Sequence, residues 1–289
     1  MTRKRKRRKR FRFLKFLLGL FFIFVIVNFL KTRYNETAYY EGDFIDKVES
    51  LFSFNFAKKD YKTDDKNILL KNIKKEADKG NDKARWLYEN SESLNDTLLY
   101  LAGNDADTIE FVYKYKNGIT DFSYFDGSSH DFSRKTPYFL QWDNRWAYKD
   151  LGNSVIGLAG CGPTSMAMIL SRLNNDITIN PEKISNDARN YMTNDGISWK
   201  FFSDEANKYG YQISDISIDE NSMINALNSG PLLVSVNRGI FTLFGHIIVI
   251  DSYKDGKFIV NDPNSLKKSE KAWSYDEICD QIAHVWLIN

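Results

Sequence analysis

Apolar residues in the second half of the chain fall into short blocks that are typical of β-strands. PLLVSVN (231–237), HIIVIDSYK (246–254) and KFIVND (257–262) are rich in valine and isoleucine, which suit strands. Only Asp255 and Gly256 separate the last two blocks, and this pair favours a two-residue hairpin turn. These blocks predict an antiparallel sheet.

Helical spacing comes before these blocks. SMAMILSRL (165–173) predicts a helix that begins near residue 162 and ends at about Leu173. Helices followed by antiparallel strands favour an α+β fold over a doubly wound parallel sheet. A last helix is predicted within YDEICDQIAHVW (275–286), where Ile278, Ile282 and Val285 recur at i, i+4 and i+7.

The start of the chain joins a basic run to an apolar stretch. Residues 13–30, FLKFLLGLFFIFVIVNFL, are interrupted only by Lys15 and Asn28. A basic run alone could mark nucleic-acid binding, whereas joined to an apolar stretch it indicates a membrane signal whose positive end stays in the cytoplasm. The following KTRYNETAYY offers no small-residue cleavage site. We predict a cytoplasmic tail (1–12), an uncleaved single-pass transmembrane signal-anchor (13–30) and all later residues outside the cell.

Composition divides the rest of the chain into three parts. Residues 31–80 are rich in Lys and Asp with short apolar islands, which predicts a polar stalk containing short helices. Residues 81–135 carry leucines near helical spacing, interrupted at Gly103, and predict a helical hairpin and a linker. The Gly, Ser and Asp cluster at 126–137 marks the approach to the main domain, residues 136–289.

The distribution of charge argues against a nucleic-acid partner. The net charge is +2, but residues 1–15 hold ten Lys or Arg and no acid, so residues 16–289 sum to −8. A nucleic-acid-binding protein is expected to carry basic charge on its folded part. Hydrophobic residues make up 43% of the chain, which is enough to bury a sizeable core.

Cysteine and histidine usage leaves few kinds of site open. A disulfide between Cys161 and Cys279 is the simple structural interpretation for an exported domain. The three histidines, His130, His246 and His284, are scattered, and no Cys/His cluster suggests zinc. No metal and no cofactor are predicted.

The surroundings of Cys161 favour a nucleophile over a disulfide. In GLAGCGPTSMAMIL (157–170), Pro163 suits the first turn of a helix. Cys161 would then lie at the helix N-terminus, where free backbone N–H groups and the helix dipole favour a thiolate. Gly160 and Gly162 would leave the sulfur open to a substrate chain. Cys279 is predicted to be an unreactive residue of the last helix.

A nucleophilic thiol needs a base, an orienting group and a donor for the oxyanion. His246 opens an apolar strand and is the best candidate base, although such a histidine is often an ordinary core residue. Asp262 follows the next strand and can orient the imidazole. It competes with Asn261, since strand parity allows only one of the two to face His246. Gln141, twenty residues before the cysteine, can offer an amide N–H to the oxyanion.

Taken together, these residues resemble a known family. QWDNRW, GCGPTSMAM and GHIIVIDSYKDGKFIVNDPNS are similar to the cysteine peptidase family 39-like domains of the papain clan, over about residues 136–289. The resemblance implies a papain-like fold with a Cys-His-Asp triad and a glutamine in the oxyanion hole. It also implies that Ser198 and Trp199 lie beside the substrate groove. Members that cleave double-glycine leader peptides are fused to transporters, so the chain resembles the stand-alone branch.

Residues and resemblance together predict a membrane-anchored, extracytoplasmic cysteine peptidase that acts on a peptide or protein substrate. Two alternatives remain open. One is a cell-wall amidase or transferase of the same clan, and the other is a non-catalytic surface protein that binds peptides or cell wall on the same fold. No oligomeric state is predicted.

Overall fold

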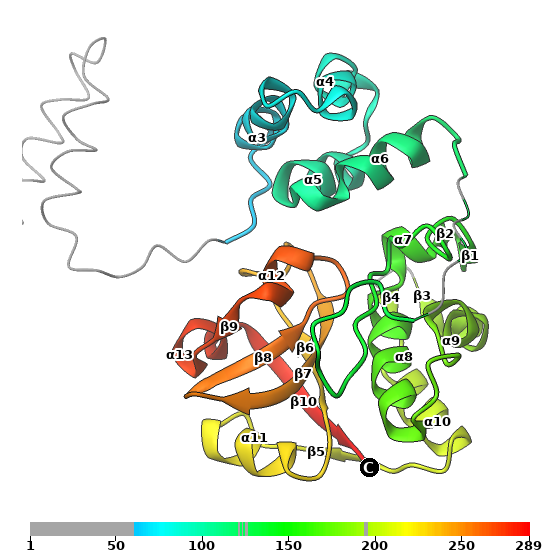
Figure 1. The fold of residues 1–289 in the computed structure, drawn as a ribbon, viewed down its shortest axis with the longest axis vertical. Coiled ribbons are helices and arrows are strands. Elements are labelled where there is room, and N and C mark those ends of the chain that lie inside the picture. Colours follow the sequence, from blue (N-terminus) through cyan, green and yellow to red (C-terminus); the bar gives the residue numbers. More distant parts are fainter. Residues whose placement is uncertain (1–60, 121, 123, 125–126, 194–195) are drawn as a thin grey trace, which may run out of the picture. The chain divides into compact units, whose positions relative to one another are not determined.

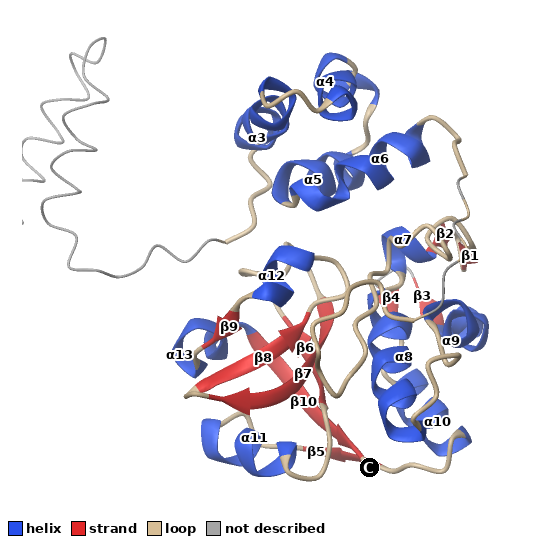
Figure 2. Ribbon diagram, viewed as in Figure 1, coloured by secondary structure: helices blue, strands red, loops and turns tan. Residues whose placement is uncertain are grey.

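The computed structural model of the protein describes residues 61–120, 122, 124, 127–193 and 196–289. The described part combines helices with an antiparallel sheet (Figures 1 and 2), so the predicted mixture of helix and antiparallel sheet is confirmed. The predicted tail and transmembrane segment (1–30) lie outside the described residues. Within those described residues, no helix has the length and apolar character needed to cross a bilayer.

The first folded region is a group of helices with a core of its own. Side-chain caps begin three of them: Asp65, Asn81 and Asn95 each accept a hydrogen bond from backbone N–H groups of the first turn. Gly103 lets two of these helices touch, since a Cβ there would lie 2.7 Å from the Leu69 side chain. The elements are α3 (Lys66–Asp78), α4 (Asp82–Glu89), η1 (Ser91–Ser93), α5 (Asp96–Asn104), η2 (Ala106–Thr108) and α6 (Ile109–Lys116).

Helix α3 falls within the predicted polar stalk (31–80), of which the structure describes residues 61–80. Helix α3 is amphipathic, as the apolar islands indicated, but its Leu69 and Ile73 are buried in the same cluster as Leu87 of α4 and Leu98 of α5. An apolar helix face is stable only when covered, and α4 and α5 cover this one. The helical region therefore begins with α3.

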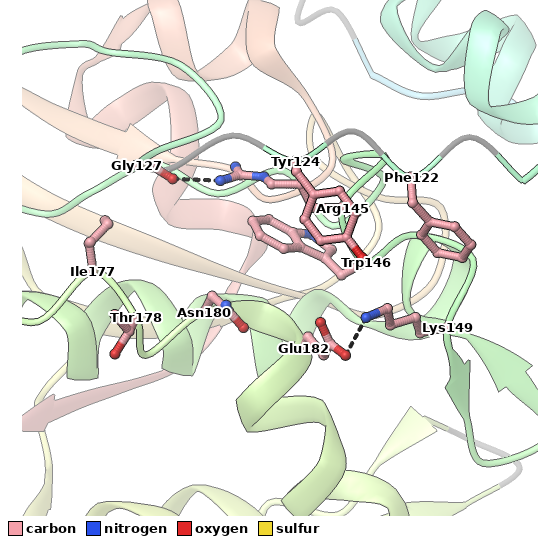
Figure 3. A pocket seen from close by; sticks show the side chains of 10 residues that line it. All are labelled: Phe122, Tyr124, Gly127, Arg145, Trp146, Lys149, Ile177, Thr178, Asn180 and Glu182. Carbon is pink, nitrogen blue, oxygen red and sulfur yellow. Dashed lines mark hydrogen bonds and ion pairs between the residues drawn. The ribbon is translucent and has the colours of Figure 1, made fainter.

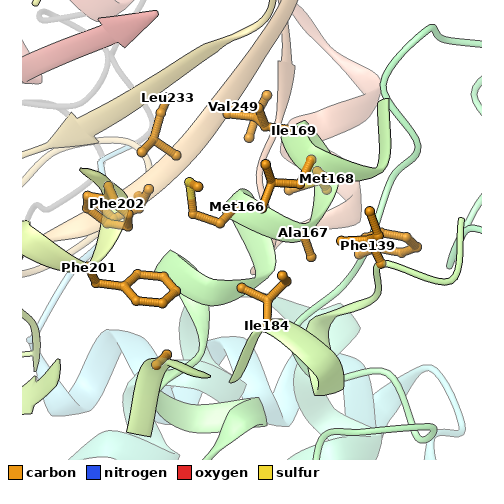
Figure 4. Packing of buried hydrophobic residues seen from close by; sticks show 14 of the residues in the cluster. Phe139, Met166, Ala167, Met168, Ile169, Ile184, Phe201, Phe202, Leu233 and Val249 are labelled. Carbon is orange, nitrogen blue, oxygen red and sulfur yellow. The ribbon is translucent and has the colours of Figure 1, made fainter. Parts of the chain in front are cut away.

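The second region is built around helix α8 (Cys161–Asn174). Residues 162–171 are all buried, and Met166, Ile169 and their neighbours interlock with side chains from the sheet and from α10 (Figure 4). Prediction and structure agree closely on the bounds of this helix. The other elements of the region are β1 (Asp150–Leu151), β2 (Ser154–Val155), α7 (Ile156–Ala159), α9 (Pro181–Ala188), η3 (Arg189–Tyr191), β3 (Met192–Thr193), β4 (Gly196–Ile197) and α10 (Lys200–Lys208).

The third region is a six-stranded antiparallel sheet in the order β5-β10-β6-β7-β8-β9. Its central strands are mostly apolar because both faces are covered: Leu233 and Val249 meet the α8 cluster, while Val234 and Ile248 meet the cluster that includes α11. The elements are β5 (Ile213–Asp215), α11 (Glu220–Leu227), β6 (Leu232–Val236), β7 (His246–Lys254), β8 (Lys257–Asn261), α12 (Leu266–Glu270), β9 (Ala272–Trp273), α13 (Tyr275–Ile278), η4 (Cys279–Gln281) and β10 (Ile282–Ile288).

The predicted hairpin turn is confirmed. Lys254 pairs with Lys257 across Asp255 and Gly256, and both turn residues have positive φ, at 52° and 76°. This is the conformation that a tight two-residue turn demands and that Asp-Gly supplies. The turn sets the register of β7 against β8 as far as Ser252, and an irregularity between Ile250 and Ser252 shifts the pairing by one residue before the far end.

The predicted last helix is wrong. Only Tyr275–Ile278 is α-helical, and Ile282–Ile288 is strand β10, paired with β5 on one side and β6 on the other. An irregularity in pairing between Ile282 and His284 brings Ile282 and Val285 into the same core cluster, although they are three residues apart. A bulge of this kind produces an apolar spacing that resembles a helix.

Candidate active site

Helix α8 presents Cys161 at its first position. The helix begins immediately after Gly160, whose carbonyl accepts the N–H of Thr164 at 2.9 Å. Pro163 lies in the first turn, where its missing N–H costs nothing. Both cysteines are free thiols, so the disulfide interpretation is wrong.

The two glycines beside Cys161 have a packing role that differs from the predicted one. A Cβ on Gly160 would lie 2.5 Å from the Ile156 carbonyl oxygen, and one on Gly162 would lie 2.8 Å from Ile197. Both glycines are buried and turn toward the protein rather than toward the cavity beside the thiol. They are needed so that α7 and β4 can approach the helix start.

His246 is the first residue of β7 and is 8% exposed. Its Nε2 lies 2.7 Å from Oδ1 of Asp262, whose side chain is fully buried. Because Nε2 is engaged there, Nδ1 is the ring nitrogen left to act on Cys161, whose pKa is lowered by His246. Thiol and imidazole border the same cavity, and the carboxylate holds the imidazole, although the three groups come from separate parts of the chain.

Asp262 is held through its backbone and through Oδ1, while its buried Oδ2 has no hydrogen-bond partner among the described residues. Its backbone N–H donates to Ser269 Oγ at 2.9 Å, and its carbonyl accepts the hydroxyl of Tyr138 at 2.8 Å. The N–H of Asn264 donates to the same Oδ1 that faces the imidazole, at 2.8 Å. Neighbouring Asn261 does not meet His246 and instead accepts a hydrogen bond from Arg134.

The electrostatics of the three groups favour a charged pair. Burial raises the pKa of the Cys161 thiol, but the hydrogen bond and charge of His246, with backbone N–H groups of Ile247 and Gly162, bring it below its ordinary value. Burial lowers the pKa of His246, but Asp262 and Cys161 raise it to about 9. Burial raises the pKa of Asp262, and the imidazole outweighs this and lowers it. These shifts favour the charged form of all three groups: thiolate, imidazolium and carboxylate.

Gln141 lies buried beside the thiol. Its Nε2 donates to the carbonyl of Gly157 at 2.9 Å, and its backbone N–H donates to the carbonyl of Pro263 at 2.8 Å. An amide nitrogen carries two hydrogens, so one remains for a ligand. Gln141 borders the same cavity as Cys161 and His246, which is where an oxyanion donor is needed.

A cavity of about 200 Å³ adjoins the thiol. Its walls come from α5, from the loop before His246 and from the residues around Cys161: Lys62, Thr97, Tyr100, Leu101, Asn104, Gln141, Leu158, Cys161, Phe241, Thr242, Leu243, Phe244, Gly245, His246 and Asn264. Neither Ser198 nor Trp199 borders it. Trp199 instead packs against Trp286 and His284, with ring centroids 4.9 Å and 5.3 Å away.

Sequence reasoning missed several residues of this site. Asn264 follows Asp262 closely and could have been suspected as a partner of its carboxylate, because a turn after a strand supplies backbone N–H groups. Ser269 instead contacts the backbone of Asp262 through its hydroxyl. No local sequence pattern indicates that α5 and Lys62 contribute to the wall of the cavity. These residues reach the cavity only through the packing of the helical region.

A larger hollow of about 370 Å³ lies elsewhere and contains none of the predicted site residues (Figure 3). Polar groups of its walls are paired with one another. Arg145 donates a hydrogen bond to the carbonyl of Gly127 at 2.7 Å, and Lys149 forms an ion pair with Glu182. No nucleophile borders it, so its size does not make it the reactive site.

Comparison with known proteins finds one matching family and two similar solved structures. The model of the Peptidase_C39 like family matches residues 134–289. Among solved structures the chain is similar to a double glycine motif protease from an AMS/PCAT transporter in complex with the leader peptide, with TM-score 0.36 and 17% identity over 57% of this chain and 98% of the other. It is also similar to the peptidase domain of Streptococcus ComA, a bi-functional ABC transporter involved in quorum sensing, with TM-score 0.35 and 17% identity over 45% and 90%. No curated protein sequence matches this chain.

Proposed function

Because the chain belongs to the Peptidase_C39 like family, we propose that it is a cysteine peptidase that hydrolyses peptide bonds through Cys161, His246 and Asp262. The family membership that the sequence motifs predicted is confirmed. The observation that carries the proposed activity is the buried contact between His246 Nε2 and Asp262 Oδ1 at 2.7 Å, at a cavity that His246 shares with Cys161, a thiol whose pKa it lowers.

Each group has a defined part in the proposed reaction. The Cys161 thiolate attacks the carbonyl carbon of the scissile amide, and Gln141 and the Cys161 backbone N–H donate to the oxyanion. The imidazolium of His246 gives its proton to the leaving amine, and the C–N bond breaks to leave a thioester on Cys161. His246 then takes a proton from water, whose oxygen attacks the thioester carbonyl. The C–S bond breaks, which releases the new C-terminal acid and restores the Cys161 thiolate and the His246 imidazolium. Asp262 holds the imidazole in one orientation throughout.

Chemical labelling of the native full-length protein tests the proposed nucleophile. Iodoacetamide at neutral pH, followed by peptide mapping, is expected to modify Cys161 much faster than Cys279, because the thiolate is the reactive form and the lowered pKa of Cys161 favours it. Cys279 is a suitable internal control, since it is also free and partly exposed. Equal labelling of the two thiols would contradict activation of Cys161.

The pH dependence of peptide hydrolysis follows from the raised pKa of His246. The imidazolium is present below about pH 9 and is lost above it, and the leaving amine then has no proton donor. We expect kcat/KM to fall as the pH rises through about 9, and to fall on the acid side as the thiolate is protonated. A rate that climbs steadily from pH 7 to 10 would instead indicate an ordinary thiol that ionises without help from His246.

We also propose that the peptidase is anchored in the cell membrane through residues 13–30, with the catalytic domain outside. The support is the sequence alone: the basic run before the apolar stretch and the absence of a cleavage pattern after it. Protease added to intact cells is expected to remove the catalytic domain. Complete protection of that domain would contradict the proposed topology.

A further inference from the structure

The catalytic cavity has a wall that lies outside the family's extent. Thr97, Tyr100, Leu101 and Asn104 of α5 border the cavity together with Lys62, whereas the family match covers only residues 134–289. We refer to these five residues as the helical wall. The reactive site of this chain is thus completed by a segment that the family fold does not require.

The helical wall is fixed to the elements that carry the catalytic groups. The N–H of Lys62 donates to the carbonyl of Gly239 at 2.9 Å, and the ring of Tyr100 lies 6.2 Å from that of Phe244. Both partners belong to the loop that leads from β6 to His246. The wall therefore spans this loop.

A second set of contacts fixes the helical region on the side of Gln141. Phe111 of α6 packs so closely on Gly157 that a Cβ there would lie 2.4 Å from the ring. The carbonyl of Gly157 is the group that holds the Gln141 amide. On the side of Asp262, the N–H of Lys267 donates to Asp107 Oδ2 at 3.2 Å. The helical region thus contacts residues close to His246, to Gln141 and to Asp262.

The direction of proton transfer identifies which half of a substrate enters this cavity. His246 gives its proton to the leaving amine, so the segment C-terminal to the scissile bond lies beside the imidazole. The cavity is bordered by His246 and by the loop before it, Phe241–Gly245. Its volume of about 200 Å³ is below the roughly 300–1,000 Å³ of pockets that enclose drug-sized ligands. A cavity of this size between the imidazole and the helical wall suits a short leaving segment.

Lys62 supplies the charge that such a segment would meet. It is the only permanently charged side chain among those that border the cavity, and it is 8% exposed. Its Nζ lies 2.6 Å from Asp105 Oδ2, and an ammonium group has three donors, so two remain. Asn104 adds none, because its amide is committed to Thr63 and to the carbonyl of Tyr100.

We propose that this enzyme removes one residue or a short segment from the C-terminus of a peptide, and that Lys62 binds the terminal carboxylate of that leaving segment. The proposal rests on the proposed function and adds the substrate class. The helical wall stops a chain that continues beyond the cavity, and the ammonium favours a chain that ends there. The hydrolysis itself is the reaction described above, and no further reactant enters.

Paired alkylation rates test the anion site without any knowledge of the substrate. The ratio of Cys161 modification by iodoacetate to that by iodoacetamide reports the cation beside the sulfur. We expect the ratio to fall about tenfold in Lys62→Met/Asp105→Asn, in which no lone charge is left buried, and to be kept in Lys62→Arg. The matched control is Lys74→Met/Asp78→Asn, which makes the same replacements in an exposed ion pair of α3. An unchanged ratio in the Lys62 double variant would overturn the site.

Peptides that differ only in the chemical group at their C-terminus test the proposed substrate class with the full-length enzyme. A mixture of random decapeptides is offered in two forms, with a free C-terminal carboxylate or with a C-terminal amide. We expect release of C-terminal residues from the free form, at least about tenfold slower release from the amidated form, and loss of this difference in Lys62→Met/Asp105→Asn. Equal internal cleavage of both forms would refute chain-end specificity while supporting the peptidase. Absence of all cleavage, with Cys161 still selectively alkylated, would refute the proposed peptidase itself.

Discussion

Replacing Cys161 with alanine is expected to lower kcat/KM for peptide hydrolysis by about 10⁴-fold or more, because no other side chain can take over the attack. The hydroxyl groups of Thr97 and Thr242 border the same cavity, but neither is the hydrogen-bond partner of His246. Alanine is a good helix former, so the fold of α8 should persist. Turnover of a fluorogenic peptide, measured with purified wild type and variant, checks this expectation.

The control for this experiment is Cys279→Ala, which removes the second thiol of the chain. Cys279 lies in η4, after α13, and does not border the catalytic cavity. Its replacement should leave turnover within about twofold of wild type, since it removes no catalytic group. Residual turnover of more than a tenth of wild type in Cys161→Ala would assign the attack to another group.

Local sequence patterns correctly predicted the features that depend only on residues adjacent in the chain. Asp255 and Gly256 specify a tight turn whatever surrounds them, and the turn aligns β7 with β8. Pro163 and the apolar run behind it determine the start and the buried face of α8. Because His246 and Asp262 lie at the ends of strands placed by that hairpin, their proximity could be predicted along with it.

Sequence patterns failed to predict the structure where contacts between distant parts of the chain determine it. The spacing of Ile278, Ile282 and Val285 is equally compatible with a helix and with a bulged strand, and only the pairing of β10 with β5 and β6 selects the strand. The polar sequence around α3 concealed an apolar stripe of Leu69 and Ile73 that is buried by α4 and α5. The helical wall is the same kind of case, since no pattern within α5 indicates that it lies opposite a thiol.

The choice between Asp262 and Asn261 yields the last prediction. Asp262→Ala is expected to lower kcat by about 10²–10⁴-fold, because the imidazole loses the group that orients it and stabilises its charge. Asn261→Ala is expected to leave kcat within about tenfold of wild type and to lower thermal stability instead. Asn261 is fully buried and is a partner of Arg134, so its loss leaves a polar group unpaired.

Asp262→Asn separates orientation from charge. The N–H of Asn264 holds Oδ1 toward the imidazole, so an asparagine at position 262 can present its carbonyl oxygen there and keep the same tautomer. The loss in kcat should then be smaller than in Asp262→Ala. The alkaline limb of the pH profile should move below its wild-type position, because the carboxylate is one of the groups that raise the pKa of His246 to about 9. An unshifted limb in Asp262→Asn, or a crippling loss of turnover in Asn261→Ala with little loss in Asp262→Ala, would mean that Asp262 does not orient His246 during turnover.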